Sequence, residues 1–124
     1  MSKKKLVLVI DDDPDILELI QTALSSEGLD VSTAKSGKEG ITAVQKRRPD
    51  LILCDMMMES IDAGVLAAHE IKQTFSDIPI YLLSSIADTT ADNIGIDELG
   101  FSGTFQKAMD PKRLVSVIKD ALSR

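Results

Sequence analysis

Three short, nearly unbroken apolar runs divide the chain, at residues 6–10, 51–54 and 80–83. Runs of this length, rich in Val, Ile and Leu and bounded by polar residues, are typical of strands buried on both faces, as in a parallel sheet. Two less apolar stretches, residues 30–34 and 103–106, are further strand candidates. The pattern therefore predicts a sheet of five parallel strands.

Segments with a helical period separate the predicted strands. The first follows Asp13, a residue favoured as a helix cap, and should end before Gly28, a residue favoured just after a helix. The second follows Ser36, with Glu39 three residues later as in a capping box, and should continue through Lys46. Two helices are therefore expected before the third strand.

Three more helices are expected beyond that strand, over residues 64–75, over residues 88–99, and after a cap at Asp110. The segment 88–99 is acidic and has few apolar residues, so we expect it to be the least firmly packed. Strand and helix thus alternate five times without an internal repeat or linker. This predicts an α/β fold with helices on both faces of the sheet and one domain over residues 1–124.

Composition limits the kinds of partner. The net charge of −6 disfavours direct binding to duplex DNA or to an anionic membrane surface. The N-terminus lacks the pattern of a secretory signal and no apolar run approaches the roughly 20 residues of a membrane span, so we expect a cytoplasmic protein. Cys54, the single cysteine, cannot form an internal disulfide and is predicted to be a buried, unreactive thiol.

Polar side chains follow the predicted strands, at the edge where α/β sheets carry their chemistry. The first strand ends in Asp11 and Asp12, and the third, fourth and fifth end in Asp55, Ser84 and Lys107. Three carboxylates at one edge would repel one another without a cation, and Mg²⁺ prefers such oxygen ligands. An aspartate beside Mg²⁺ can attack phosphorus, while a lysine neutralises the phosphoryl group and a serine hydrogen-bonds it.

These stretches resemble the receiver domain of the two-component response regulator family. The resemblance rests on residues 6–14, 49–58 and 78–85 and on Lys107, in that order and over essentially the entire chain. It implies a flavodoxin-like, doubly wound sheet with strand order 2-1-3-4-5. It also implies a signalling switch rather than a conventional enzyme. This switch would catalyse its own phosphorylation from the donor and its own dephosphorylation.

The resemblance further implies roles for individual residues. Asp55 would be the phosphoacceptor, with Ser84 as the switch hydroxyl and Lys107 as the phosphate-binding lysine. The implied ligands of Mg²⁺ are Asp11, Asp12, Asp55 and the main-chain carbonyl of Met57. The implied phosphodonor is a sensor histidine kinase or a histidine phosphotransfer protein, and a downstream protein target would bind through the fourth helix, fifth strand and fifth helix.

Departures from the family pattern leave alternatives open. Glu59 and Ala108 stand where receivers usually have proline, and Thr104 occupies the position of the switching aromatic residue. A degenerate receiver that binds a partner without phosphorylation is one alternative. Another is a phosphatase of the haloacid dehalogenase type that uses Asp11 as its nucleophile, although Asp15 stands where that family has Thr or Val. We expect either a stand-alone receiver or part of a longer protein.

Overall fold

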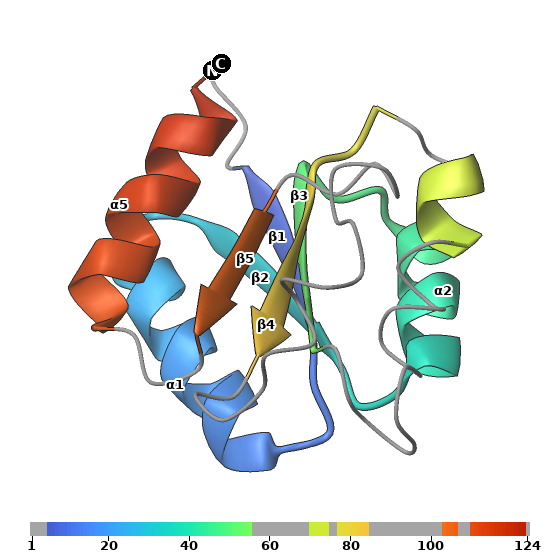
Figure 1. The fold of residues 1–124 in the computed structure, drawn as a ribbon, viewed down its shortest axis with the longest axis horizontal. Helices are drawn as coiled ribbons and strands as arrows, with labels where there is room; N and C mark the ends of the chain where they lie inside the picture. The colour runs from blue at the N-terminus through green and yellow to red at the C-terminus, as the bar shows by residue number, and fades with distance from the viewer. Residues whose placement is uncertain (1–4, 56–69, 75–76, 85–102, 107–109, 124) are drawn as a thin grey trace.

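The computed structural model describes residues 5–55, 70–74, 77–84, 103–106 and 110–123 (Figure 1). Within these ranges, five strands form one parallel sheet in the order β2-β1-β3-β4-β5. The strands are β1 (Leu6–Ile10), β2 (Asp30–Ala34), β3 (Leu51–Asp55), β4 (Ile80–Ser84) and β5 (Gly103–Gln106). The predicted doubly wound sheet is confirmed, and β3 and β4 are each one residue longer than the apolar pattern indicated.

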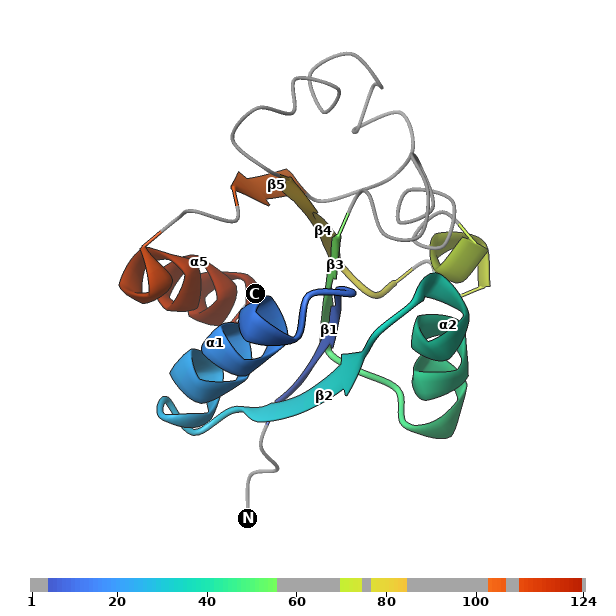
Figure 2. The same ribbon diagram turned by 90° about the horizontal axis from the view of Figure 1, so that it is seen from below.

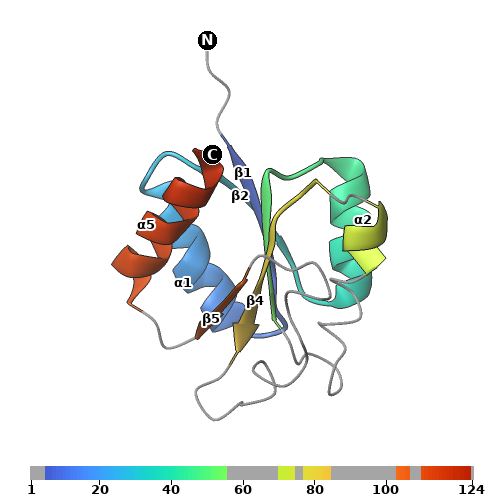
Figure 3. The same cartoon turned by 45° about the horizontal axis from the view of Figure 1, so that its top comes forward.

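Helices cover both faces of this sheet (Figures 1 and 3). The helices α1 (Pro14–Ser25) and α5 (Pro111–Leu122) lie on one face, and α2 (Gly37–Lys46) lies on the other, together with the helical residues 70–74. The helix predicted over residues 64–75 is thus described only in part. The helix predicted over residues 88–99 lies outside the described residues.

The predicted helix caps are present. Asp13, Ser36 and Asp110 each accept a hydrogen bond on the side chain from a main-chain N–H two or three residues later, at 2.9, 3.1 and 3.0 Å. These bonds satisfy N–H groups that have no partner within their helices. After α1, Gly28 adopts φ +82°, a left-handed conformation that glycine enters without steric cost. Local sequence signals therefore set the helix ends.

The core has two apolar layers, because successive side chains of a strand point to opposite faces. The layer beneath α2 contains Leu8, Ile10, Ala34, Val44, Ile52, Cys54, Ile71, Ile78, Ile80 and Leu82. The layer beneath α1 and α5 contains Val7, Val9, Leu17, Ile20, Leu24, Leu51, Leu53, Leu83, Leu114, Val115 and Ile118. The central strands are buried on both faces, so their ends are held in fixed positions.

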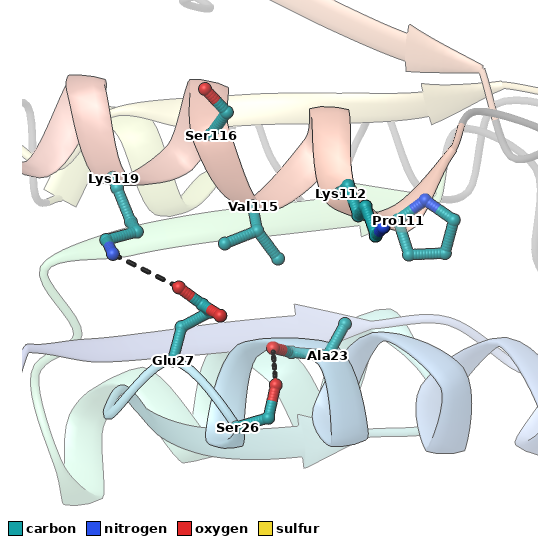
Figure 4. Close-up of a pocket in the computed structure, with 8 residues that line it drawn as sticks. All are labelled: Ala23, Ser26, Glu27, Pro111, Lys112, Val115, Ser116 and Lys119. Carbon is teal, nitrogen blue, oxygen red and sulfur yellow. Dashed lines mark hydrogen bonds and ion pairs between the residues drawn. The ribbon is translucent and has the colours of Figure 1, made fainter.

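An open groove of about 590 Å³ lies between α1 and α5 (Figure 4). Val115 points from α5 toward α1 and is buried, and an ion pair of 3.2 Å joins Lys119 of α5 to Glu27 just after α1. The two helices are therefore joined by both an apolar and a charged contact.

None of the helices in the described part of the chain combines the length and apolar character needed to cross a bilayer.

Candidate functional site

Strand register brings two of the predicted carboxylates together at the carboxyl end of the sheet. Ile10 at the end of β1 pairs with Cys54 of β3, so the residues that follow them, Asp11 and Asp55, lie side by side. Asp55 is still part of β3 and pairs with Leu83 of β4. The position of Asp55 is therefore set by its own pairing with β4 and by the pairing of the preceding residue, Cys54, with β1.

A tight turn after β1 orients the next two acids. The N–H of Asp11 donates to the carbonyl of Ala34 at 3.0 Å and extends the pairing with β2 by one residue. Oδ1 of Asp11 then accepts a hydrogen bond from the N–H of Asp13 at 2.9 Å. Asp13 in turn caps α1, so the chain passes from strand to helix within three residues. Asp12, between these two anchored residues, is exposed at the rim.

Asp11, Asp12 and Asp55 form an acidic cluster. One carboxylate oxygen from each residue lies within 4.8 Å of the other two. Asp11 is fully buried and Asp55 is 3% exposed. Two unit charges about 5 Å apart repel by roughly 3 kcal/mol at an effective dielectric constant of about 20. Three hard oxygen donors at this spacing, one of them open to solvent, suit a small divalent cation such as Mg²⁺.

Cys54 lies directly behind the cluster and is buried, as predicted. Its Sγ–H donates to the carbonyl of Asp55 at 3.6 Å. Burial, together with the negative charges of Asp55 and Asp11, raises the pKa of the Cys54 thiol. The thiol therefore stays protonated and is not a nucleophile, because the thiolate is the reactive form.

The remaining predicted site residues are placed only in part. Ser84 is the last residue of β4, and β4 is the neighbour of β3, so its main chain lies at the same end of the sheet as Asp55. Its register partner is Gln106, the last residue of β5. Lys107 follows Gln106 but, like Met57, lies outside the described residues. Among the departures from the family pattern, Thr104 pairs with Leu82, whereas Glu59 and Ala108 lie outside the described residues.

One residue beneath the site was not singled out from the sequence. A Cβ atom added to Gly40 of α2 would lie 2.4 Å from Cδ1 and 3.0 Å from Cγ1 of Ile10, the residue before Asp11. Glycine inside a helix costs about 1 kcal/mol relative to alanine, so a helical glycine points to a close approach. The signal was present in the sequence, but the contacting residue could not be read from it.

Comparison with known proteins agrees with this geometry. A family model, described as the response regulator receiver domain, matches residues 7–119. The probable transcriptional regulator ycf27 of Cyanophora paradoxa is 38% identical over 121 residues, which cover 98% of this chain and 49% of that protein. The DNA-binding response regulator MtrA of Mycolicibacterium smegmatis is 31% identical over 121 residues, covering 98% and 52%. The chain thus spans about half the length of these curated relatives.

Solved structures give the same result. A putative response regulator from Chloroflexus aurantiacus is 30% identical and superimposes with a TM-score of 0.87, covering 98% of this chain and 100% of that one. The receiver domain of NtrX from Brucella abortus is 28% identical with a TM-score of 0.86, covering 94% and 98%. The chain belongs to the response regulator receiver domain family, the phosphoacceptor signalling domains of two-component systems.

Proposed function

We propose that Asp55 is the residue that accepts the phosphoryl group, and that Mg²⁺ binds beside it. The observation that carries this proposal is the convergence of Asp11, Asp12 and Asp55, whose carboxylate oxygens lie within 4.8 Å of one another. Of the three, Asp55 is the one held within a strand between two others. Asp11 already uses one oxygen in the turn after β1. Asp55 is therefore the better placed nucleophile.

The proposed reaction is a single displacement at phosphorus. A carboxylate oxygen of Asp55 forms the new bond to phosphorus, the bond from phosphorus to the donor nitrogen breaks, and its electron pair stays on the donor imidazole. Asp11, Asp12, Asp55 and the carbonyl of Met57 would hold Mg²⁺, which would supply positive charge to the phosphoryl oxygens. Ser84 and Lys107 would hydrogen-bond and neutralise these oxygens, in keeping with their positions at the ends of β4 and β5.

The same residues would also limit the lifetime of the phosphorylated state. As a receiver domain it is a signalling switch rather than a classical enzyme. We propose that it promotes both its own phosphorylation and the later hydrolysis of the aspartyl phosphate. A phosphate on Asp55 adds about two negative charges, which would draw Ser84 and Lys107 inward and change the surface beside them. A receiver unit spanning residues 1–124 is part of this proposal.

Receiver domains act together with kinases, and this suggests partners for the chain. We propose a sensor histidine kinase or a histidine phosphotransfer protein as phosphodonor, in the cytoplasm, and a protein target that binds residues 88–99, β5 and α5. MtrA is named as DNA-binding, and this chain spans about half of it. The expectation that the chain itself makes no direct contact with nucleic acid therefore stays a prediction.

Mass spectrometry of the intact chain tests the assignment. We expect incubation with acetyl phosphate and Mg²⁺ to add one phosphoryl group to the wild type. The adduct should be lost in Asp55→Ala and when Mg²⁺ is chelated. Asp15→Asn is the matched control, because Asp15 is an exposed acid in the first turn of α1, outside the acidic cluster. It should be phosphorylated like the wild type.

Three outcomes would contradict the proposal. An adduct that persists in Asp55→Ala would place the phosphoryl group on another residue. Turnover of a phosphate ester that depends on Asp11 and not on Asp55 would indicate a phosphatase. Failure of the wild type to accept a phosphoryl group from acetyl phosphate or from a phosphohistidine donor, in a chain that still binds Mg²⁺, would indicate a degenerate receiver.

A further inference from the structure

The sheet has an open edge at β2. In the described residues, β2 is the outermost strand and pairs only with β1 (Figure 2). The N–H of Asp30 donates to the carbonyl of Lys5 at 2.9 Å, and the carbonyl of Ala34 accepts from Asp11 at 3.0 Å. Main-chain groups alternate in direction along a strand in a parallel pair, so those of Val31 and Thr33 point away from β1. These two residues offer two donors and two acceptors to an added strand.

A groove of about 350 Å³ runs along this edge, between β2 and α2. Thr33 lines it from the strand, and Lys38, Thr42 and Lys46 are among the residues that line it from the helix. Thr33 is itself exposed. The outward main-chain groups of β2 therefore open beside a groove lined mostly by lysine and threonine residues, together with Glu39 and Ala43.

The charge at this edge is opposite to that of the chain as a whole. Lys35, Lys38 and Lys46 are exposed and form no ion pair within the part of the chain that the structure describes. Lys38 and Lys46 line the groove, and Glu39 is the acid that lines it with them. The chain carries a net charge of −6, so a local excess of free lysines sets this edge apart. Exposed edge strands with lysines reject neutral apolar strands but attract acidic ones.

The spacing of the lysines defines the segment that fits. Lys38 and Lys46 are eight residues apart on one helix, about 12 Å at 1.5 Å per residue. The same length corresponds to about four residues of extended chain at 3.3 Å each. Side chains four residues apart in a strand point to the same face. Two acids at this spacing would therefore both face α2 and reach one lysine each.

We propose that the β2 edge binds an extended acidic segment of a partner protein as a sixth strand. Its main chain pairs with Val31 and Thr33, and two carboxylates four residues apart pair with Lys38 and Lys46. A second copy of this chain is a poor occupant, because pairing two β2 edges side by side would bring two sets of these lysines together. The inference does not depend on Asp55 chemistry, since the site lies at the edge of the sheet.

Binding of short capped peptides to the full chain, labelled with ¹⁵N, tests the proposal. The test peptide alternates Val and Thr and carries Glu at two positions four residues apart. One control has Gln in place of both Glu, and a second has the Glu residues three apart, so that they point to opposite faces. We expect only the test peptide to slow amide exchange of Val31 and Thr33. Exchange at Ser32, whose N–H points toward β1, should not respond.

Variants separate strand pairing from charge. Thr33→Pro removes an outward N–H that the sheet does not use, so we expect folding without binding, while Thr33→Val retains binding. Circular dichroism checks that the proline variant folds. Lys38→Glu together with Lys46→Glu should weaken binding at least about tenfold, whereas Lys112→Glu on α5 should not.

Several results would overturn the proposal. They are absence of binding, equal binding of the Gln peptide, binding without protection of Val31 and Thr33, or full binding to the Lys38→Glu, Lys46→Glu double variant. Self-association of the chain with protection of the same two amides, measured by sedimentation without peptide, would show that a second copy occupies the edge instead.

Discussion

The two ends of the sheet both carry aspartates, but they use them in different ways. At the amino end, Asp50 accepts a hydrogen bond from the N–H of Leu6 at 2.8 Å. Asp30 pairs with Arg47 at 2.9 Å, and Asp77 pairs with Arg48. Each of these acids thus has a donor or a cation supplied by a neighbouring segment. These contacts link residues that are distant in the sequence, and they form without a bound ligand.

At the carboxyl end, the acids face one another instead. Asp11, Asp12 and Asp55 lie close enough for their charges to oppose one another, and two of them are buried. Such an arrangement is unfavourable in the absence of a cation and becomes favourable when one binds. Acids of the same type therefore join neighbouring segments of the fold at one end and form the proposed Mg²⁺ site at the other. The difference lies in which groups the fold places around them.

The largest effect is expected from the packing behind the carboxyl end. Gly40→Ala adds a Cβ within 2.4 Å of Cδ1 of Ile10, so we expect the free energy of unfolding to fall by about 1–3 kcal/mol. Ile10→Val removes that Cδ1 and should restore part of the loss in the double variant. Urea denaturation measures both. An increase in stability in Gly40→Ala would mean that Ile10 moves aside without cost.

A smaller loss is expected at the amino end. Asp50→Ala removes the acceptor of the Leu6 N–H, which should lower the free energy of unfolding by about 1–2 kcal/mol. The loss should be the same with and without Mg²⁺, because Asp50 lies at the opposite end from the acidic cluster. Asp50→Asn keeps a side-chain oxygen and should lose less. A loss that depends on Mg²⁺ would show that the two ends are coupled.

The opposite sign is expected for an acid of the cluster. Asp12→Asn relieves repulsion at an exposed position, so the metal-free chain should become more stable by about 0.5–1 kcal/mol. With Mg²⁺ present, the wild type should instead be the more stable of the two, because we expect it to bind the ion more tightly and to be stabilised by that binding. Urea denaturation with and without Mg²⁺ measures both effects, and Asp15→Asn is the control. If Asp12→Asn lowered the free energy of unfolding in the absence of Mg²⁺, the acids at the carboxyl end would not repel one another as we infer.

The smallest effect is expected from pH at the amino end. A hydrogen bond from Arg48 lowers the pKa of Asp77 below its ordinary value of 3.8. The pair therefore contributes its full stabilisation above pH 3.8 and loses it as the pH falls through the lower pKa of the folded state. Asp77→Asn should be slightly less stable than the wild type near neutral pH, and this difference should disappear in acid. Urea midpoints measured across this pH range test the prediction.

Local signals in the sequence were sufficient for much of the fold. The caps at Asp13, Ser36 and Asp110 lie where the residue types predicted, because a cap depends only on its own helix end. Three apolar runs and two less apolar stretches located the five strands. The apolar runs stopped one residue short of Asp55 and Ser84, which are the last residues of β3 and β4. Both are polar, and their pairing depends on the neighbouring strand, which an apolar pattern cannot indicate.

The sequence by itself thus determined the kind and order of the described elements and indicated the residues for which we propose chemistry, while the strand order followed from family resemblance. Only the tertiary structure decided the strand register that brings these acids together. The pairing of Ile10 with Cys54 brings Asp11 beside Asp55, and the same sheet leaves Val31 and Thr33 facing outward. Periodicity encodes which side of an element is buried. Strand register depends on how two apolar layers pack across the whole sheet, so it cannot be read from any one segment.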